Sequence, residues 1–401
     1  MPTARLGTPE FVVLFSLVTS MIAISIDAVL PAMDIIGRDL NVAHPNDVQL
    51  VISMFILGMV AGELVFGPLS DAIGRKRAIL IGIFIYVVGT LIAMSAGTLF
   101  ELLAGRVVQG IGVSGPKIGS RALIRDQFEG DAMARITSLI FMIFILVPMI
   151  APALGQLILI FASWRWIFLL FLGLALIVSL WLGLRQPETL APERRIPIAL
   201  PHLMVNTILI VRHPKVMACT LAAGLIFGAI IVYVSTSQAL FADLYDKQES
   251  FPLYFAILAS AIGLSSFWNS QLVMRFGMSA MATVALCGLI LTSTALLMVT
   301  FAYQGVPPFA LFMGLCFVAF GCFGLLFGNL NAMAMEALGR VAGLGASLIA
   351  AFSSLIAVIL SVSVGRFYDQ TLFPMTFGFL LAGVGSLILI LAVRRNRSGA
   401  V

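Results

Sequence analysis

Four charged side chains in this sequence lie inside long apolar runs, and they are Asp27, Glu63, Arg106 and Lys117. A charge is costly away from water, so each is expected to pair with an opposite charge or to face a water-filled space. A carboxylate beside a cation in such surroundings can bind and release a proton as the cation moves. Reversible protonation is therefore the chemistry that these residues could carry.

The spacing of the two cations places them on one face of a helix. Arg106 and Lys117 are eleven residues apart, which on an α-helix is about three turns plus roughly 20°. At a rise of about 1.5 Å per residue, Asp27 falls near the depth of Arg106, and Glu63 near that of Lys117. We expect two acid–base pairs at two depths, Asp27 with Arg106 and Glu63 with Lys117.

Three of these residues also have another interpretation. Asp27 could cap the chain near Pro31, Arg106 could be a structural anchor, and Lys117 could attract an anion. Uncharged polar residues inside apolar runs are further candidates for lining a cavity, although hydrogen bonding between helices would also explain them. These candidates are Gln109, Tyr233, Gln238 and Asn329.

The elements that position these residues are predicted from composition. The 401 residues are 61% hydrophobic and 10% charged, with a mean hydropathy of +1.11, whereas soluble domains have about a quarter charged residues. Apolar runs of about 20 residues predict membrane-spanning helices. The sequence indicates an all-α membrane protein with twelve spans, near residues 10–31, 48–69, 78–96, 99–122, 134–160, 165–184, 215–240, 252–273, 279–302, 308–334, 342–365 and 373–393.

A polar, proline-rich interruption divides the spans into two sets of six. We expect an N-terminal bundle over residues 1–185, a linker over 186–213 and a C-terminal bundle over 214–401. Basic residues in the loops and at the ends of the spans are strongly biased, with seventeen on one side and four on the other. The richer side should be cytoplasmic, which places both termini and the linker inside the cell.

Several other classes of protein are excluded. The four cysteines lie in apolar runs without metal-binding or disulfide spacing, and the three histidines lie in loops. The sequence has no HExxH motif, no GxSxG motif and no phosphate-binding loop, so it offers no catalytic base, metal or ATP site, and we expect neither an enzyme nor a bound cofactor. The net charge of +5 arises in short loops between spans and does not indicate a nucleic-acid partner.

One loop motif is specific to a family. The residues from Gly67 to Arg77, GPLSDAIGRKR, resemble the signature between the second and third spans of the major facilitator superfamily. Glycines permit close helix approach and a tight turn, Asp can cap a helix or bind a cation, and the three cations keep the loop in the cytoplasm. We expect a cytoplasmic gate formed by Gly67, Asp71, Gly74, Arg75, Lys76 and Arg77.

Other segments resemble the proton-coupled drug antiporters of the bicyclomycin and chloramphenicol resistance branch. They are DAVLP from Asp27, RVVQG from Arg106, APALG from Ala151 and SWRWIF from Ser163. The resemblance implies a two-bundle fold, monomeric in a bacterial inner membrane, that exports small and mostly hydrophobic molecules by alternating access in exchange for protons. It also implies that Asp27 and Arg106 take part in proton coupling; we add Glu63 to them because of its buried charge.

The fifth span departs from the family pattern. The antiporter-like motif of Pro148, Pro152 and Gly155 has Ala151 and Gln156 where the family usually has glycines. Both prolines remove backbone donors, so a kink or pivot is expected there. Two alternatives to drug export stay open: proton-coupled transport of one anionic metabolite, selected by Arg106 and Lys117, and a membrane receptor or scaffold.

Overall fold

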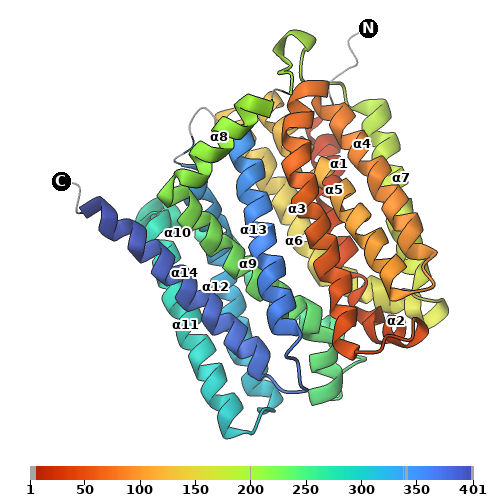
Figure 1. The fold of residues 1–401 in the computed structure, drawn as a ribbon, viewed down its shortest axis with the longest axis vertical. Helices are drawn as coiled ribbons and strands as arrows, with labels where there is room; N and C mark the ends of the chain where they lie inside the picture. Colours follow the sequence, from red (N-terminus) through yellow and green to blue (C-terminus); the bar gives the residue numbers. More distant parts are fainter. Residues whose placement is uncertain (1–5, 199, 337, 339–341, 399–401) are drawn as a thin grey trace. The chain divides into compact units, whose positions relative to one another are not determined.

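The computed structural model describes residues 6–198, 200–336, 338 and 342–398, which form helices and turns with no β-strand among them (Figure 1). The chain divides into two compact units, Met1–Leu203 and Met204–Val401, and the division falls inside the segment 186–213. The expected all-α membrane fold is confirmed. Among the described residues, twelve helices have at least 20 residues, enough to cross a hydrocarbon layer of about 30 Å.

The first unit holds six of these long helices. Its elements are α1 (Thr8–Asp27), η1 (Leu30–Ala32), α2 (Met33–Asp39), η2 (Pro45–Gln49), α3 (Leu50–Ile73), α4 (Arg75–Met94), α5 (Leu99–Gln127), α6 (Gly130–Phe161), α7 (Arg165–Arg185) and η3 (Pro192–Arg194).

Helix α5 packs tightly against α3 and α4 (Figure 1). A Cβ atom added at Gly110 would lie 1.9 Å from the carbonyl oxygen of Phe55 on α3, and one at Gly112 would lie 2.2 Å from the backbone nitrogen of Tyr86 on α4. Only glycine allows backbones to approach this closely, as is common between membrane helices. These contacts fix the direction in which the polar side chains of α5 point.

The second unit holds the other six long helices. Its elements are α9 (Pro214–Ala239), η4 (Leu240–Leu244), α10 (Phe251–Phe276), α11 (Met278–Ala302), α12 (Phe309–Met335), α13 (Ala342–Gly365) and α14 (Phe373–Ser398). Helix α9 packs against α12, α13 and α14, and η4 extends α9 as one turn of π-helix. Hydroxyls join the helices: Ser353 Oγ donates to Thr220 O at 3.1 Å, and Ser386 Oγ to Ala222 O at 3.3 Å.

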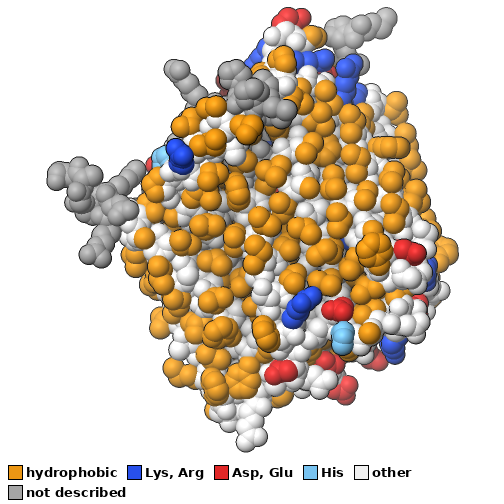
Figure 2. Space-filling model, in the orientation of Figure 1, with side chains coloured by type: hydrophobic (Ala, Val, Ile, Leu, Met, Phe, Trp, Pro, Cys, Tyr) orange, Lys and Arg blue, Asp and Glu red, His pale blue; other side chains and the backbone are white. Residues whose placement is uncertain are grey.

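Eleven helical segments of the described residues are long and apolar enough to cross a membrane. Helix α5 is not in this set, since it combines several glycines with Arg106, Lys117 and Arg121. On the visible face, hydrophobic side chains predominate along the helices, and the few charged ones lie mainly toward helix ends (Figure 2). Large apolar side chains such as Phe84 and Phe161 are exposed, as expected where lipid is the solvent.

The segment 186–213 contains a helix that apolar runs did not predict. Helix α8 (Leu200–Arg212) has 13 residues, too few to be recognised as a span of about 20 residues. It crosses the boundary between the two compact units. The segment predicted as a linker is therefore partly helical.

Candidate functional site

Arg106 on α5 is completely buried, and it donates hydrogen bonds to three acceptors, which lie on α1, α3 and α5. Its Nε donates to the carbonyl oxygen of Val51 at 3.0 Å, and its Nη2 to that of Ser25 at 2.9 Å. Its Nη1 donates to Gln109 Oε1 at 2.6 Å. The guanidinium also lies 4.4 Å from the ring centroid of Phe55, a cation–π contact. Arg106 therefore ties α5 to α1 and α3.

A chain of side-chain hydrogen bonds extends this arrangement to α4. Gln109 Nε2 donates to Thr90 Oγ1 at 2.8 Å, and the hydroxyls of Tyr86 and Ser25 are 2.6 Å apart. Gln109, a predicted cavity residue, is thus a buried link between Arg106 and α4. Sequence analysis did not select Tyr86 or Thr90, because a single hydroxyl in an apolar helix gives no signal of its partner.

Asp27 is the last residue of α1 and is 6% exposed. In the described part of the chain it forms no ion pair with Arg106, so the predicted direct pair is wrong for this conformation. Arg106 instead binds the carbonyl of Ser25, two residues earlier. The reason is local: carbonyls in the last turn of a helix lack intrahelical partners and carry the negative end of the helix dipole, so they attract a cation.

Helix α6 contacts the chain directly beside Asp27. A Cβ atom at Gly155 would lie 2.0 Å from the carbonyl oxygen of Ala28, so only glycine permits this approach. Pro148 and Pro152 lie inside one continuous helix, α6. The antiporter-like residues therefore meet the end of α1 through Gly155.

The predicted contact between Glu63 and Lys117 is present. Lys117 Nζ on α5 forms an ion pair and a hydrogen bond with Glu63 Oε1 on α3. The Glu63 side chain is fully buried, and the Lys117 side chain is 16% exposed. The prediction succeeded because the rise of a helix fixes the depth of its residues. The positive charge of Lys117 is balanced by a carboxylate.

Carboxylates and cations are the titratable groups that the first unit brings together at depth. On α5, Lys117 pairs with Glu63, whereas Arg106 binds the carbonyl of Ser25, two residues before Asp27. Among the described residues, no group of three or more His, Cys, Asp or Glu is arranged to hold a metal ion.

Arg75 is the centre of the loop motif between α3 and α4. Its guanidinium forms ion pairs with Asp71 and with Asp126 at the end of α5, the latter at 3.0 Å. It also donates to Ser70 Oγ at 3.1 Å. The motif therefore joins α3, α4 and α5 through one buried cation.

Gly74 turns the chain from α3 into α4 with φ of 109°, a conformation that favours glycine. Beside it lies Glu188, from the segment after α7. Glu188 Oε1 accepts the backbone N–H of Arg75 at 2.9 Å, of Thr189 at 3.0 Å and of Leu190 at 3.2 Å. No local pattern predicts this contact, because Glu188 is 113 residues away from Arg75.

The remaining motif residues differ in their surroundings. Lys76 Nζ donates to the carbonyl oxygen of Gly183 near the end of α7 at 2.7 Å. Gly67 is buried within α3, and Arg77 is exposed. Lys76 is thus bonded to α7, whereas the Arg77 side chain is exposed.

In the second unit, Tyr233 and Gln238 lie in the C-terminal half of α9, just before η4. Tyr233 is buried, with its ring stacked on Phe255 at 5.8 Å and edge-on to Phe320 at 4.7 Å between centroids. Gln238 is 4% exposed, and its Nε2 has no hydrogen-bond partner among the described residues. A single π-helical turn often marks a functional position in a helix.

Asn329 on α12 is joined to another helix. Its Nδ2 donates to Asn269 Oδ1 on α10 at 2.8 Å and to the carbonyl of Leu325 at 2.9 Å. Because both contacts are internal to the unit, helix–helix bonding is the role that this geometry supports for Asn329.

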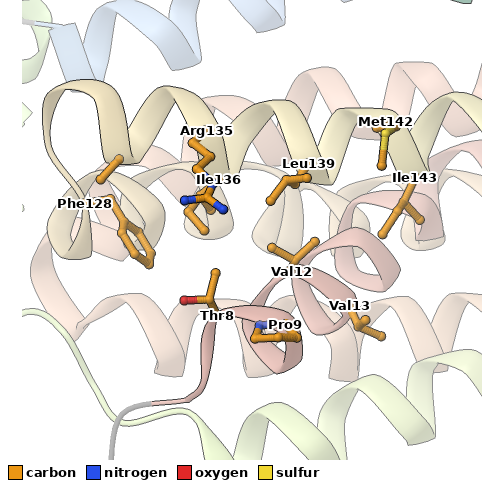
Figure 3. Close-up of a pocket in the computed structure, with 11 residues that line it drawn as sticks. Thr8, Pro9, Val12, Val13, Phe128, Arg135, Ile136, Leu139, Met142 and Ile143 are labelled. Atoms are coloured by element: carbon orange, nitrogen blue, oxygen red, sulfur yellow. The ribbon is translucent and has the colours of Figure 1, made fainter.

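A pocket of about 620 Å³ lies between the beginnings of α1 and α6 (Figure 3). Its lining is mostly apolar, with one cation, Arg135, and one aromatic ring, Phe128. None of the predicted site residues lines it. The lining residues are Thr8, Pro9, Val12, Val13, Phe128, Ala132, Arg135, Ile136, Leu139, Met142 and Ile143.

Known proteins share this fold, and some are similar to the chain in sequence. The sequence profile of the Major Facilitator Superfamily matches residues 14–361. The chain belongs to this superfamily. Its members are membrane transporters, not enzymes, and the resemblance inferred from the loop motif is confirmed. The D-xylose–proton symporter matches 95% of this chain and 96% of its own, with a TM-score of 0.76 and 15% identity. The human organic anion transporter MFSD10 has a TM-score of 0.66 at 16% identity, covering 96% and 99%.

Bacterial relatives are similar over most of both chains. The uncharacterized MFS-type transporter YdgK of Bacillus subtilis is 30% identical over 91% of this chain and 90% of its own. The bicyclomycin resistance protein homolog of Haemophilus influenzae is 28% identical over 92% of each. Multidrug resistance protein D of Escherichia coli is 27% identical, again over 92% of each. These names agree with the predicted branch of the superfamily.

Proposed function

We propose that this transporter exports small, largely apolar molecules in exchange for protons. The observation that carries the proposal is the buried cation Arg106 on α5. It binds the carbonyl of Ser25 at the end of α1, and Ser25 lies two residues before Asp27. Buried charge at membrane depth is costly and is kept where it has a function. The names of the relatives from Haemophilus influenzae and Escherichia coli support drugs as the substrate class.

Proton exchange at Asp27 would act through Arg106. While Asp27 is protonated and neutral, Arg106 binds the carbonyl of Ser25 and caps α1. Once Asp27 loses its proton, the carboxylate attracts the guanidinium away from that carbonyl. The cap is then lost, and the contact of Ala28 with Gly155 transmits the change to α6. Protonation of one side chain thereby alters how α1, α5 and α6 pack.

The other predicted residues take supporting roles in this proposal. Glu63 and Lys117 form a second proton-sensitive pair, and the loop from Gly67 to Arg77 is the cytoplasmic gate. Tyr233, Gln238 and Asn329 are proposed for the substrate cavity, where an aromatic surround suits apolar compounds of varied shape. Asn329 is the weakest of the three because Asn269 already satisfies it.

The proposed setting is a bacterial inner membrane, with the protein as a monomer. The bias of basic residues supports cytoplasmic termini. Bundles over residues 1–185 and 214–401, joined by 186–213, would rock about the substrate to open on alternate sides. No cofactor is needed, since the proton gradient supplies the energy.

Selective transport of an anionic metabolite is less well supported. Lys117 is neutralised by Glu63, and Arg106 is fully engaged by two carbonyls and an amide. An anion would have to displace these partners.

Transport in proteoliposomes with an imposed pH gradient tests the proposal. We expect a panel of neutral drugs to move against the proton flow, and Asp27→Asn to abolish gradient dependence. Asp34→Asn, an exposed aspartate on α2, is the matched control and should leave transport unchanged. Flux that ignores the gradient, or movement of small organic anions alone, would contradict the proposal.

A further inference from the structure

The pocket between the beginnings of α1 and α6 has a polar end and an apolar end (Figure 3). At the polar end, the Arg135 side chain extends from α6 toward Thr8 on α1. Val13 on α1 and Met142 and Ile143 on α6 line the apolar end. All of the lining residues belong to the first unit. The volume of about 620 Å³ is suited to one small molecule.

The pocket runs in the direction in which a membrane changes from polar to apolar. The apolar stretch of α6 begins at Arg135, and that of α1 begins at Thr8. Ile143 is eight residues beyond Arg135, which is about 12 Å further along the helix. A ligand that matches this lining has one polar end and an apolar body.

The polar end is suited to a negative charge. Arg135 is exposed, and no carboxylate among the described side chains forms an ion pair with it. None of the described residues that line the pocket is acidic. A guanidinium binds a carboxylate through two parallel hydrogen bonds, and the hydroxyl of Thr8 is a further donor.

The start of α1 is held in place by contacts on its other side. Glu10 Oε1 accepts hydrogen bonds from Trp181 Nε1 at 3.0 Å and from Arg185 Nε at 2.9 Å, both on α7. Phe11 is buried, and its ring lies edge-on to that of Phe128 with 5.1 Å between centroids. A ligand would therefore enter a preformed pocket without having to order this end of the helix.

We propose that this pocket binds the anion of a long-chain fatty acid, with the carboxylate on Arg135 and Thr8 and the hydrocarbon chain directed toward Ile143. Val13 and Met142, which are exposed by 42% and 62%, would be covered by the chain. Arg135 is the one cation among the described lining residues, so a ligand with a single negative charge balances it. A pocket bounded by two helices suits a single chain, whereas a phospholipid would need room for two.

A photoreactive fatty acid tests the site in the full-length protein. Palmitate with a diazirine near the end of its chain is added to the protein in neutral detergent and cross-linked by light, and labelled peptides are located by mass spectrometry. We expect labels near Val13, Met142 and Ile143. Labels spread evenly over exposed apolar residues of other helices, such as Phe84 on α4, would mean that the chain only coats the membrane-facing surface. That result would overturn the proposal.

Arg135→Gln tests the carboxylate contact. We expect the dissociation constant for palmitate to rise about five- to tenfold, because a charge-assisted hydrogen bond is lost. Arg275→Gln, at an exposed arginine in the last turn of α10, is the matched control and should bind palmitate like the unaltered protein. Equal affinity of the two variants would contradict the contact with Arg135.

Leu139→Trp tests the path of the hydrocarbon chain. Leu139 lines the pocket, and a larger side chain there would take up the space of the ligand, so cross-linking at Met142 and Ile143 should be lost. Cross-linking that persists would place the chain elsewhere. Arg135 is exposed, so its replacement keeps the test valid if Leu139→Trp fails to fold.

Competing ligands test the chemical class. Hexadecanol has the same chain length without a charge, and it should compete with the palmitate probe about five- to tenfold less well than palmitate does. Phosphatidylglycerol, with a negative headgroup and two chains, should compete poorly. Equal competition by hexadecanol would show that charge is not recognised, and stronger competition by phosphatidylglycerol would assign the pocket to a phospholipid; either result would overturn the proposal. None of these measurements depends on transport, so they are independent of the proposed export activity.

Discussion

The α-carbon of Gly155 on α6 faces the carbonyl of Ala28 so closely that a Cβ atom would lie 2.0 Å from the oxygen. This contact lies next to Asp27, at the end of α1. It joins the antiporter-like residues of α6 to the proposed proton-binding carboxylate. A change in either helix must therefore be accommodated by the other.

Gly155→Ala should destabilise the protein and reduce gradient-driven transport, because the added methyl group has no room. Overpacking of this kind typically costs about 1–3 kcal/mol. Gly173→Ala on α7 is the matched control, since nothing lies within 4 Å of a Cβ atom there. Thermal unfolding in detergent and drug flux measure the effect, and equal behaviour of the two variants would show that the close contact has no consequence.

Arg106→Lys should lose proton coupling although the positive charge is kept. Lysine lacks the planar fork that serves Ser25, Val51 and Gln109 at once. Each buried acceptor left without a donor costs about 1–3 kcal/mol. The measurement is drug flux at several pH gradients, with Arg38→Lys at an exposed position on α2 as the control for conservative replacement. Normal coupling in Arg106→Lys would mean that charge alone is sufficient.

Replacing one partner of the Glu63–Lys117 ion pair should destabilise the protein more than replacing both. Loss of one partner from a buried ion pair commonly costs about 3–5 kcal/mol, because an uncompensated charge remains. We expect Glu63→Gln and Lys117→Met each to lower stability, and the double variant to recover much of it. Unfolding of all four proteins gives the coupling energy.

The same variants test the role of this pair in transport. If Glu63→Gln retains the pH dependence of the unaltered protein, Glu63 takes no part in proton coupling. A Lys117→Ala variant that loses transport of an anionic substrate but keeps transport of neutral drugs would favour the metabolite alternative.

Glu188→Gln should weaken the turn between α3 and α4. The charged oxygen of Glu188 accepts three backbone N–H groups, including that of Arg75 at the start of α4. Loss of a helix N-terminal cap costs about 0.5–2 kcal/mol. We expect faster proteolysis at this loop and slower transport, with the exposed Glu193→Gln as the control. Unchanged proteolysis would show that an uncharged amide is an equally good acceptor.

Much of the fold was predictable because membrane helices are built from local information. Each long helix of the described residues corresponds to a predicted span, and all but α5 are strongly apolar, since backbone groups in lipid must be satisfied within the helix. The spacing of Arg106 and Lys117 predicted their common face, and helical rise predicted the contact of Lys117 with Glu63. Helix α8 was missed because 13 residues are too few to form a span.

The sequence by itself determined which residues carry buried charge and on which helices they lie. Tertiary structure decided their partners. Arg106 binds the carbonyl of Ser25 and not the carboxylate of Asp27, because α1 ends there and exposes its last carbonyls. Glu188 reaches Arg75 across 113 residues, and Asn329 is satisfied by Asn269 on another helix. Periodicity fixes depth and face along one helix, whereas the partner depends on how neighbouring helices pack, which no local pattern records.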